Sequence, residues 1–261
     1  MFSQQYDSNN NKFQLNITIT CNGEKKFRVW SEEFQKPNSK YGDREIVVNG
    51  SRTIYFPFPV SPKTLFIGVL NSTSPTDKDF KVELSESALV DYNIWLDAQT
   101  RDFLNLAVPF CQVSGFVGAS QSGKLFKSKD DQFKIVYFDA IRDDKGAIMN
   151  TPARIGHQSG RIEVAKAKFN AYTIPMRLII LLHEYSHKYK NPKIGLEIEN
   201  EVGADINALY IYLGLGFSKV DAICVFANVF LKAQTKGNIE RMRKIMDYIQ
   251  RFENQEFAKK N

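Results

Sequence analysis

Apolar and polar residues alternate in short runs along the first third of the chain. The runs are KFQLNITITC at 12–21, REIVVNGSRTIYF at 44–56, TLFIGVL at 64–70 and KVELSESALV at 81–90. Alternation with a period of two is typical of strands that bury one face. Asn49-Gly50, between two β-rich runs, predicts a tight hairpin. The pattern therefore predicts a small antiparallel β-sandwich over residues 1–90, of a kind that docks or positions a partner.

From Asp91 onward the apolar residues recur at helical spacing in longer segments. The pattern predicts a helix over 97–110, strands within 133–141 and 160–169, and helices over 174–190, 197–213, from 218 and over 238–252. Thr173 and Pro175 are typical of a helix start, and Asn191-Pro192 of a helix end. The fold class expected is α+β, with a second domain over 91–261.

In the last helix, one stripe of apolar residues recurs at helical spacing and is predicted to pack in the core. It comprises Ile239, Met242, Ile245, Met246 and Ile249. A capping box with Asp in place of Glu, Ser218 and Asp221, is predicted to open the preceding helix.

Composition and charge exclude several classes of protein. The 261 residues are 43% hydrophobic and 25% charged, which is typical of a folded globular chain. The net charge of +6 is spread among acidic residues, so a focused nucleic-acid groove is not favoured. The longest aliphatic run, Leu178 to Leu182, is too short for a membrane span, and no export leader is recognisable. Three distant cysteines indicate reduced thiols, so we expect a cytoplasmic protein.

The segment GASQSGKL at 118–125 partly matches a phosphate-binding loop. Leu125 stands where that loop needs a Ser or Thr hydroxyl to hold Mg²⁺, and the residues that follow are a poor helix start. We interpret the segment as a flexible connector.

The strongest chemical signal is His183-Glu-Tyr-Ser-His187 within the predicted helix at 174–190. Residues four apart lie on one helix face, so both imidazoles can reach a single ion. Glu184 lies beside that ion without needing to bind it, where a general base for water must be. The pattern is the zincin signature His-Glu-x-x-His, and it predicts a Zn²⁺ site.

Catalytic zinc normally takes three protein ligands, so a third must come from elsewhere. Glu201 is our first choice, with Asp205 one helical turn later as acceptor for the distal N–H of a ligating histidine, His183 in our prediction. Glu197, one turn earlier on the same face, is the alternative ligand. Three small residues, Gly203, Ala204 and Ala208, would let the two helices approach closely.

The residues 183–187 followed by Glu201-Val-Gly-Ala-Asp205 resemble the gluzincin metallopeptidases, whose pattern is His-Glu-x-x-His and then Glu-x-x-x-Asp. The resemblance covers about Ile155 to Phe226 and is closest to compact, phage-encoded members. It implies a zincin-like domain in which zinc is bound by His183, His187 and Glu201.

The resemblance also implies a peptidase that acts through metal-bound water with Glu184 as general base, on a protein or peptide substrate. The strand at 160–169 would border the cleft and pair with the substrate by β-augmentation. The donor to the oxyanion is left open among His157, Tyr172 and Tyr210.

Two alternatives to the peptidase stay open at this point. One is a catalytically silent virion or assembly protein, with a partner on the β module and a zinc site that serves as a clamp. The other is an antirepressor peptidase.

Overall fold

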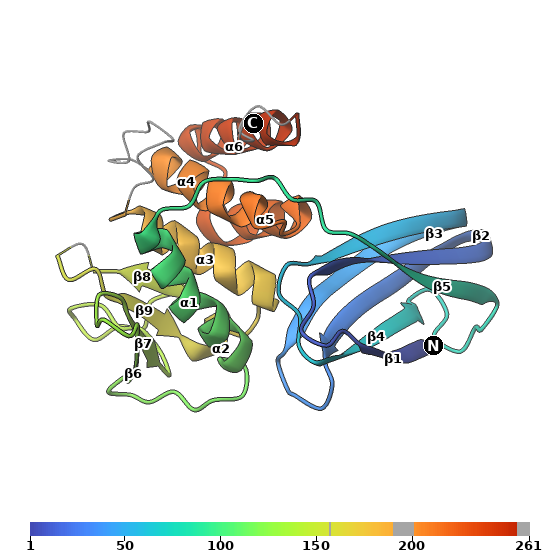
Figure 1. Cartoon of the computed structure of the whole chain (residues 1–261), viewed down its shortest axis with the longest axis horizontal. Coiled ribbons are helices and arrows are strands. Elements are labelled where there is room, and N and C mark those ends of the chain that lie inside the picture. The colour runs from blue at the N-terminus through green and yellow to red at the C-terminus, as the bar shows by residue number, and fades with distance from the viewer. Residues whose placement is uncertain (157, 190–200, 255–261) are drawn as a thin grey trace. The chain divides into compact units, whose positions relative to one another are not determined.

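The computed structural model describes residues 1–156, 158–189 and 201–254 (Figure 1). The chain divides into two compact units, Met1–Val90 and Asp91–Asn261. The division falls where the sequence changes from short alternating runs to longer helical ones. The first unit is an antiparallel β structure and the second is mixed, so the chain is α+β. Among the described residues, no helix is both long and apolar enough to cross a bilayer.

The first unit contains five strands that hydrogen bonds join into one antiparallel sheet. They are β1 (Phe2–Asp7), β2 (Phe13–Glu33), β3 (Lys40–Phe58), β4 (Thr64–Asn71) and β5 (Phe80–Ser87). β3 pairs along one edge of the long β2, while β5 and β4 share its other edge and β1 pairs with β4. The hydrogen bonds thus do not form the two separate sheets of the predicted sandwich.

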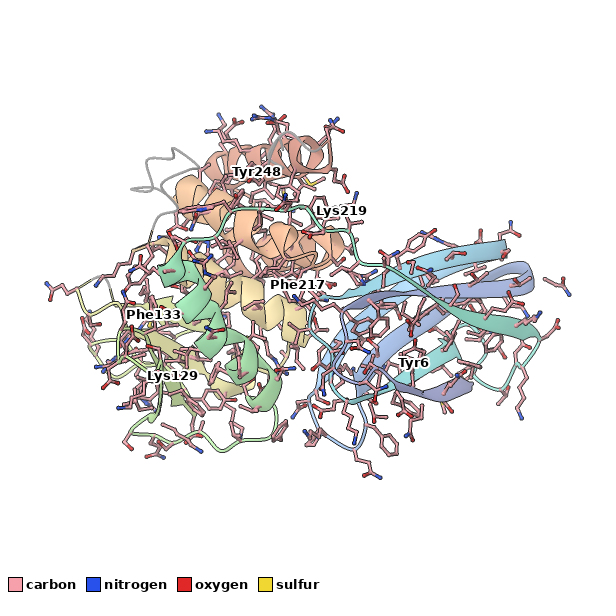
Figure 2. The ribbon with its side chains drawn as sticks, in the orientation of Figure 1. Tyr6, Lys129, Phe133, Phe217, Lys219 and Tyr248 are labelled. Atoms are coloured by element: carbon pink, nitrogen blue, oxygen red, sulfur yellow. The ribbon has the colours of Figure 1, made fainter. Side chains whose placement is uncertain are left out.

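The single sheet folds over itself into two layers around a shared aromatic core. Tyr6 of β1 lies 5.6 Å from Phe13 of β2, although these strands are not hydrogen-bonded to each other. Tyr41 and Phe58, near opposite ends of β3, have ring centroids 6.0 Å apart. Such a contact requires a sharp fold midway along the ribbon, because an extended strand of that length would hold the two rings tens of ångströms apart. Figure 2 labels Tyr6 within this unit.

The fold in the ribbon lies where we predicted a hairpin. Asn49-Gly50 does not join two strands but lies inside β3, opposite a register irregularity between Cys21 and Glu24. Gly50 (φ 77°) and Gly23 (φ 70°) adopt left-handed backbone conformations that other residues rarely accept. The prediction of a two-residue hairpin was therefore wrong, because the flexible residues bend a continuous ribbon instead of ending it.

The second unit packs helices against a four-stranded sheet. Its strands are β6 (Lys124–Lys127), β7 (Lys134–Phe138), β8 (Ala153–Ile155) and β9 (Ile162–Ala165), in the order β6-β7-β9-β8. Its helices are α1 (Ala98–Val113), α2 (Lys166–Phe169), α3 (Ile174–Ser186), α4 (Glu201–Gly214), α5 (Lys219–Val225), the π-helical turn η1 (Phe226–Phe230) and α6 (Lys236–Glu253). β7 and β9 are parallel, and both outer strands are antiparallel to their neighbours. The connector predicted at 118–125 is confirmed only up to Gly123, because Lys124 and Leu125 belong to strand β6.

Helix α3 is the central element of the second unit. It packs against α1, α4, α5 and strands β8 and β9, and nearly every one of its residues is buried. Thr173 occupies the N-cap position and Pro175 the first turn, as predicted, although the Thr173 hydroxyl makes no capping hydrogen bond. The Tyr185 ring stacks on Phe103 of α1 at 4.3 Å, and its hydroxyl lies 3.1 Å from that of Thr100. These contacts fix α3, and with it the histidines that it carries.

Helix α6 buries two residues of the predicted stripe, Ile245 and Ile249, together with two aromatic residues that lie outside it. Ile239 and Met246 are exposed, at 56% and 44%, and the buried residues are Ile245, Tyr248, Ile249 and Phe252. Helical spacing alone fits both the predicted stripe and the neighbouring one that contains Tyr248 and Phe252. The aromatic stripe is buried because it offers the larger apolar surface. The face that is buried lies in line with Arg241, one turn before Ile245.

Candidate metal centre

Helix α3 carries both histidines at its C-terminal end. We predicted that the helix would extend to Lys190, but it ends at Ser186, and His187 is the C-cap residue. His187 keeps helical backbone angles (φ −67°, ψ −19°), so the four-residue spacing still places it one turn from His183 on the same face. The prediction of one shared face therefore does not depend on the length of the helix.

Helix α4 carries Glu201 as its first residue and Asp205 one turn later. Gly203, Ala204 and Ala208 are buried, and α4 packs against α3. Asn207 extends the contact, because its amide donates to Ser186 Oγ at 2.8 Å. Glu197, the alternative ligand, lies outside the described residues.

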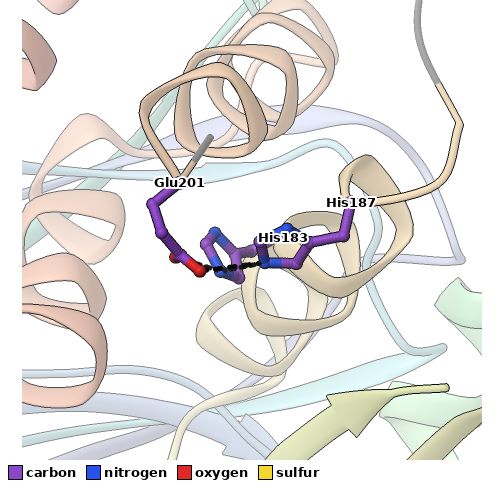
Figure 3. A group of neighbouring side chains, drawn as sticks. All are labelled: His183, His187 and Glu201. Atoms are coloured by element: carbon purple, nitrogen blue, oxygen red, sulfur yellow. Dashed lines mark hydrogen bonds and ion pairs between the residues drawn. The ribbon is translucent and has the colours of Figure 1, made fainter. Parts of the chain in front are cut away.

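Three potential ligand atoms converge between the two helices (Figure 3). The two Nε2 atoms of His183 and His187 are 3.1 Å apart. Glu201 places one carboxylate oxygen 3.6 Å from His183 Nε2 and the other 3.7 Å from His187 Nε2. A tetrahedral zinc site with bonds of about 2.0–2.1 Å has ligands about 3.3 Å apart. With one atom taken from each side chain, the three ligand atoms lie within 4.8 Å of one another, which is within reach of a single metal ion.

Asp205 lies behind His183, as predicted. Its Oδ1 is 2.9 Å from His183 Nδ1, and the carboxylate is fully buried. The approach is bent away from the line of a ring N–H, so it is a close polar contact and not an aligned hydrogen bond. A carboxylate at this position favours a proton on Nδ1, which leaves the Nε2 lone pair for a metal.

The sequence interpretation missed Arg241 of α6. Its guanidinium donates to both oxygens of Asp205, at 2.8 to 3.0 Å, and its Nη2 lies 3.1 Å from Glu201 Oε2. This paired hydrogen bonding fixes the orientation of a carboxylate. One arginine thus holds both acids of the site. A signal was present in the sequence, because Arg241 is a charged residue in line with the buried face of α6.

Phe230 was also missed. It ends the π-helical turn, where Leu231 N donates to Phe226 O over five residues at 2.9 Å. The Phe230 ring centroid lies 3.9 Å from that of the His183 imidazole, with the rings tilted by 30°. π-Helical turns are rare and often occur at functional sites. The turn brings an aromatic ring against a potential ligand and restricts the orientation of that ligand.

A cavity of about 940 Å³ opens over the three ligand atoms. The residues that line it come from the loop before β8, β8, α2, α3, α4, η1 and α6; they include Met149, Thr151, Arg154, Lys168, Tyr172, Glu184, Val202, Asn228, Val229, Lys232 and Asn238. Glu184 is buried, 8% exposed, and reaches this cavity from the same helix as the histidines. A buried carboxylate beside three converging ligands has the place that a general base requires.

Of the three candidates for an oxyanion donor, Tyr172 lines the cavity. Burial raises the pKa of its hydroxyl above the ordinary 10.0, so the group stays protonated at neutral pH and can donate. Tyr210 was a wrong candidate, because its hydroxyl lies within 3.2 Å of both the N–H and the C=O of Trp95, away from the cavity. His157 lies outside the described residues.

We predicted that the strand within 160–169 borders the cleft, but the edge strand whose residues line the cavity is β8. β9, within the predicted 160–169 strand, is paired on both sides, with β7 and β8. β8 is the edge strand, and its residues line the cavity. The β8–β9 register leaves the main-chain groups of Ala153 and Ile155 pointing away from β9. β8 was missed because a strand of three residues is too short to show alternation.

Comparisons of the chain with protein-family models, with curated proteins and with solved structures found no match. The group formed by His183, His187 and Glu201, with Asp205 and Arg241 behind it, is therefore the basis for any assignment of function.

Proposed function

We propose that the protein is a zinc-dependent peptidase of the gluzincin type. The observation that supports this most strongly is the convergence of one ligand atom each from His183, His187 and Glu201, all within 4.8 Å of one another. Bound zinc would act as a Lewis acid, polarising a carbonyl and activating water at neutral pH. The remaining chemistry belongs to the residues of the chain.

Glu184 is the general base in this proposal. Its carboxylate lines the cavity, takes a proton from the attacking water and then returns it to the leaving amine. Tyr172 is the candidate donor to the carbonyl oxygen as negative charge develops there. Asp205 and Arg241 hold His183 and Glu201 in place and do not touch the substrate in this scheme.

Among the described residues no strand pairs with the side of β8 that faces away from β9, and this side provides a place for an extended peptide. The N–H and C=O of Ile155 point away from β9 and are the pairing groups in this proposal, whereas Ala153 is 2% exposed and its C=O already accepts from Thr151 Oγ1 at 2.7 Å. A substrate strand that pairs here would run along the wall of the cavity that contains Glu184. Strand pairing fixes the backbone of the substrate and leaves its side chains free to set specificity.

The test compares wild type with Glu184→Gln in two measurements, zinc content after dialysis and cleavage of casein. Glu240→Gln, on the exposed side of α6, is the matched control. We expect all three proteins to bind one zinc, and Glu184→Gln to cleave more slowly by a factor of about 10² or more. Absence of zinc from the wild type would overturn the proposal. Zinc with cleavage that does not depend on Glu184 would favour the silent virion or assembly protein, in which the site is a clamp.

A further inference from the structure

The described residues that line the cavity carry more positive than negative charge. The basic side chains are Arg154, Lys168, Lys232 and Arg241, and the acidic ones are Glu184 and Glu201. Both acids already have roles in the proposed chemistry, as base and as metal ligand. A substrate that enters the cavity therefore meets basic side chains at the positions that the reaction itself does not use.

The two arginines are paired with acids behind them. Arg154 donates to Glu163 at 2.8 Å, and Arg241 pairs with Asp205 at 2.8 Å. Glu163 also pairs with Arg161, so the charge of Arg154 is only partly balanced, whereas Arg241 contacts both Asp205 and Glu201. These ion pairs hold both arginines against the wall of the cavity and leave them less free than an unpaired side chain to meet a ligand.

The two lysines differ from the arginines in this respect. Lys168 of α2 and Lys232, just after η1, are both exposed, and within the described part of the chain no acidic side chain forms an ion pair with either. They come from separate elements and line the same cavity. Two uncompensated ammonium groups at a cleft attract anionic ligands and repel cationic ones.

We propose that the substrate is an acidic peptide, with Asp or Glu residues on both sides of the bond to be cleaved, and that Lys168 and Lys232 recognise these carboxylates. The proposal rests on the peptidase function and names its substrate class. Pairing along β8 would carry alternate side chains of the peptide toward the cavity walls. The lysines then select the acidic side chains, while the strand edge holds the backbone without regard to sequence.

The experiment measures binding, so that it does not depend on cleavage. Three fluorescein-labelled peptides differ only in carrying Glu, Gln or Lys at the same positions, and anisotropy reports their binding to zinc-loaded Glu184→Gln protein. We expect the Glu peptide to bind about three- to ten-fold more tightly than the Gln peptide, because each exposed charge pair contributes about 0.2–1 kcal/mol. The advantage should shrink as salt is raised.

The charge reversal Lys168→Glu with Lys232→Glu, made in the same protein, should remove or reverse this preference. The matched control reverses two exposed lysines outside the cavity, Lys134 and Lys244, and should keep it. Equal affinity for all three peptides, no binding to any of them, or an equal loss in the control would overturn the proposal. Casein cleavage by the wild type is measured in parallel. Cleavage without an acidic preference refutes only the substrate class, and an acidic preference without cleavage refutes only the hydrolysis.

Discussion

Asp205→Asn is the substitution that most directly tests how the site is held together. Asp205 is fully buried, accepts hydrogen bonds from Arg241 on both oxygens at 2.8 to 3.0 Å, and lies 2.9 Å from His183 Nδ1. Asparagine has nearly the same shape but carries no charge and only one acceptor oxygen. Arg241 or His183 must then face an amide NH₂ where it now faces an oxygen.

Two effects of different origin are expected from this change. Without metal, the free energy of unfolding should fall by about 2–4 kcal/mol, because charge-assisted hydrogen bonds to a buried carboxylate are lost. With metal, zinc affinity should fall by about 10–100-fold, equivalent to about 1.4–2.7 kcal/mol, because His183 loses the group that orients its ring. The loss of zinc affinity adds to the loss of stability, because zinc affinity measures the free-energy difference between the apo and the zinc-bound folded protein.

Urea unfolding of the metal-free protein gives the first value, and competition with a chromophoric chelator gives the second. Asp247→Asn, on the exposed surface of α6, is the control and should change neither. Zinc affinity within two-fold of wild type in a destabilised Asp205→Asn protein would refute the reasoning about His183. The role of Asp205 would then be limited to joining α4 and α6.

Three further predictions concern the metal and the N-terminal unit. His187→Ala should abolish the rise in Tm that added zinc gives the wild type, measured by differential scanning fluorimetry; an unchanged rise would exclude His187 as a ligand. Gly42→Ala should lower the free energy of unfolding by about 1–3 kcal/mol in urea, because the added methyl group meets the Phe56 ring in the facing layer; a neutral result would contradict the two-layer packing. Burial would raise the pKa of Asp43, but hydrogen bonds, led by that from Arg28, hold it below the ordinary 3.8. A lowered pKa stabilises the fold above pH 3.8, and this contribution is lost as the pH falls through the lower native value. Asp43→Asn should therefore be less stable at neutral pH and should lose less stability on acidification, as measured by urea unfolding at several pH values.

The sequence was most informative where the geometry is local. The spacing of His183 and His187 places them on one face of any helix, and the same holds for Glu201 and Asp205. Small residues on α4 indicated the close approach that brings the two pairs together. The helical period and the small side chains of α4 were therefore sufficient to predict that His183, His187 and Glu201 come together.

The remaining features depend on contacts between distant segments. Arg241 reaches Asp205 from 36 positions further along the chain, and no local pattern specifies which helix will cover the site. The same limit applied to β8, which becomes an edge strand only through the order of the whole sheet. In the first unit, Asn49-Gly50 lies inside a continuous strand and not at the predicted hairpin, because the pairing of all five strands decides whether such residues end a strand or fold it.

The position of Arg241 has a consequence for the order in which the molecule is made. The ligands lie between residues 183 and 201, yet the guanidinium that fixes Glu201 and Asp205 is encoded on a helix that begins at Lys236. Synthesis proceeds from the N-terminus at about 5–20 residues per second, and domains fold as they emerge. A nascent chain therefore exposes both histidines for seconds before the clamp can form. The arrangement of Glu201 and Asp205 seen in the structure can therefore form only after α6 has been synthesised.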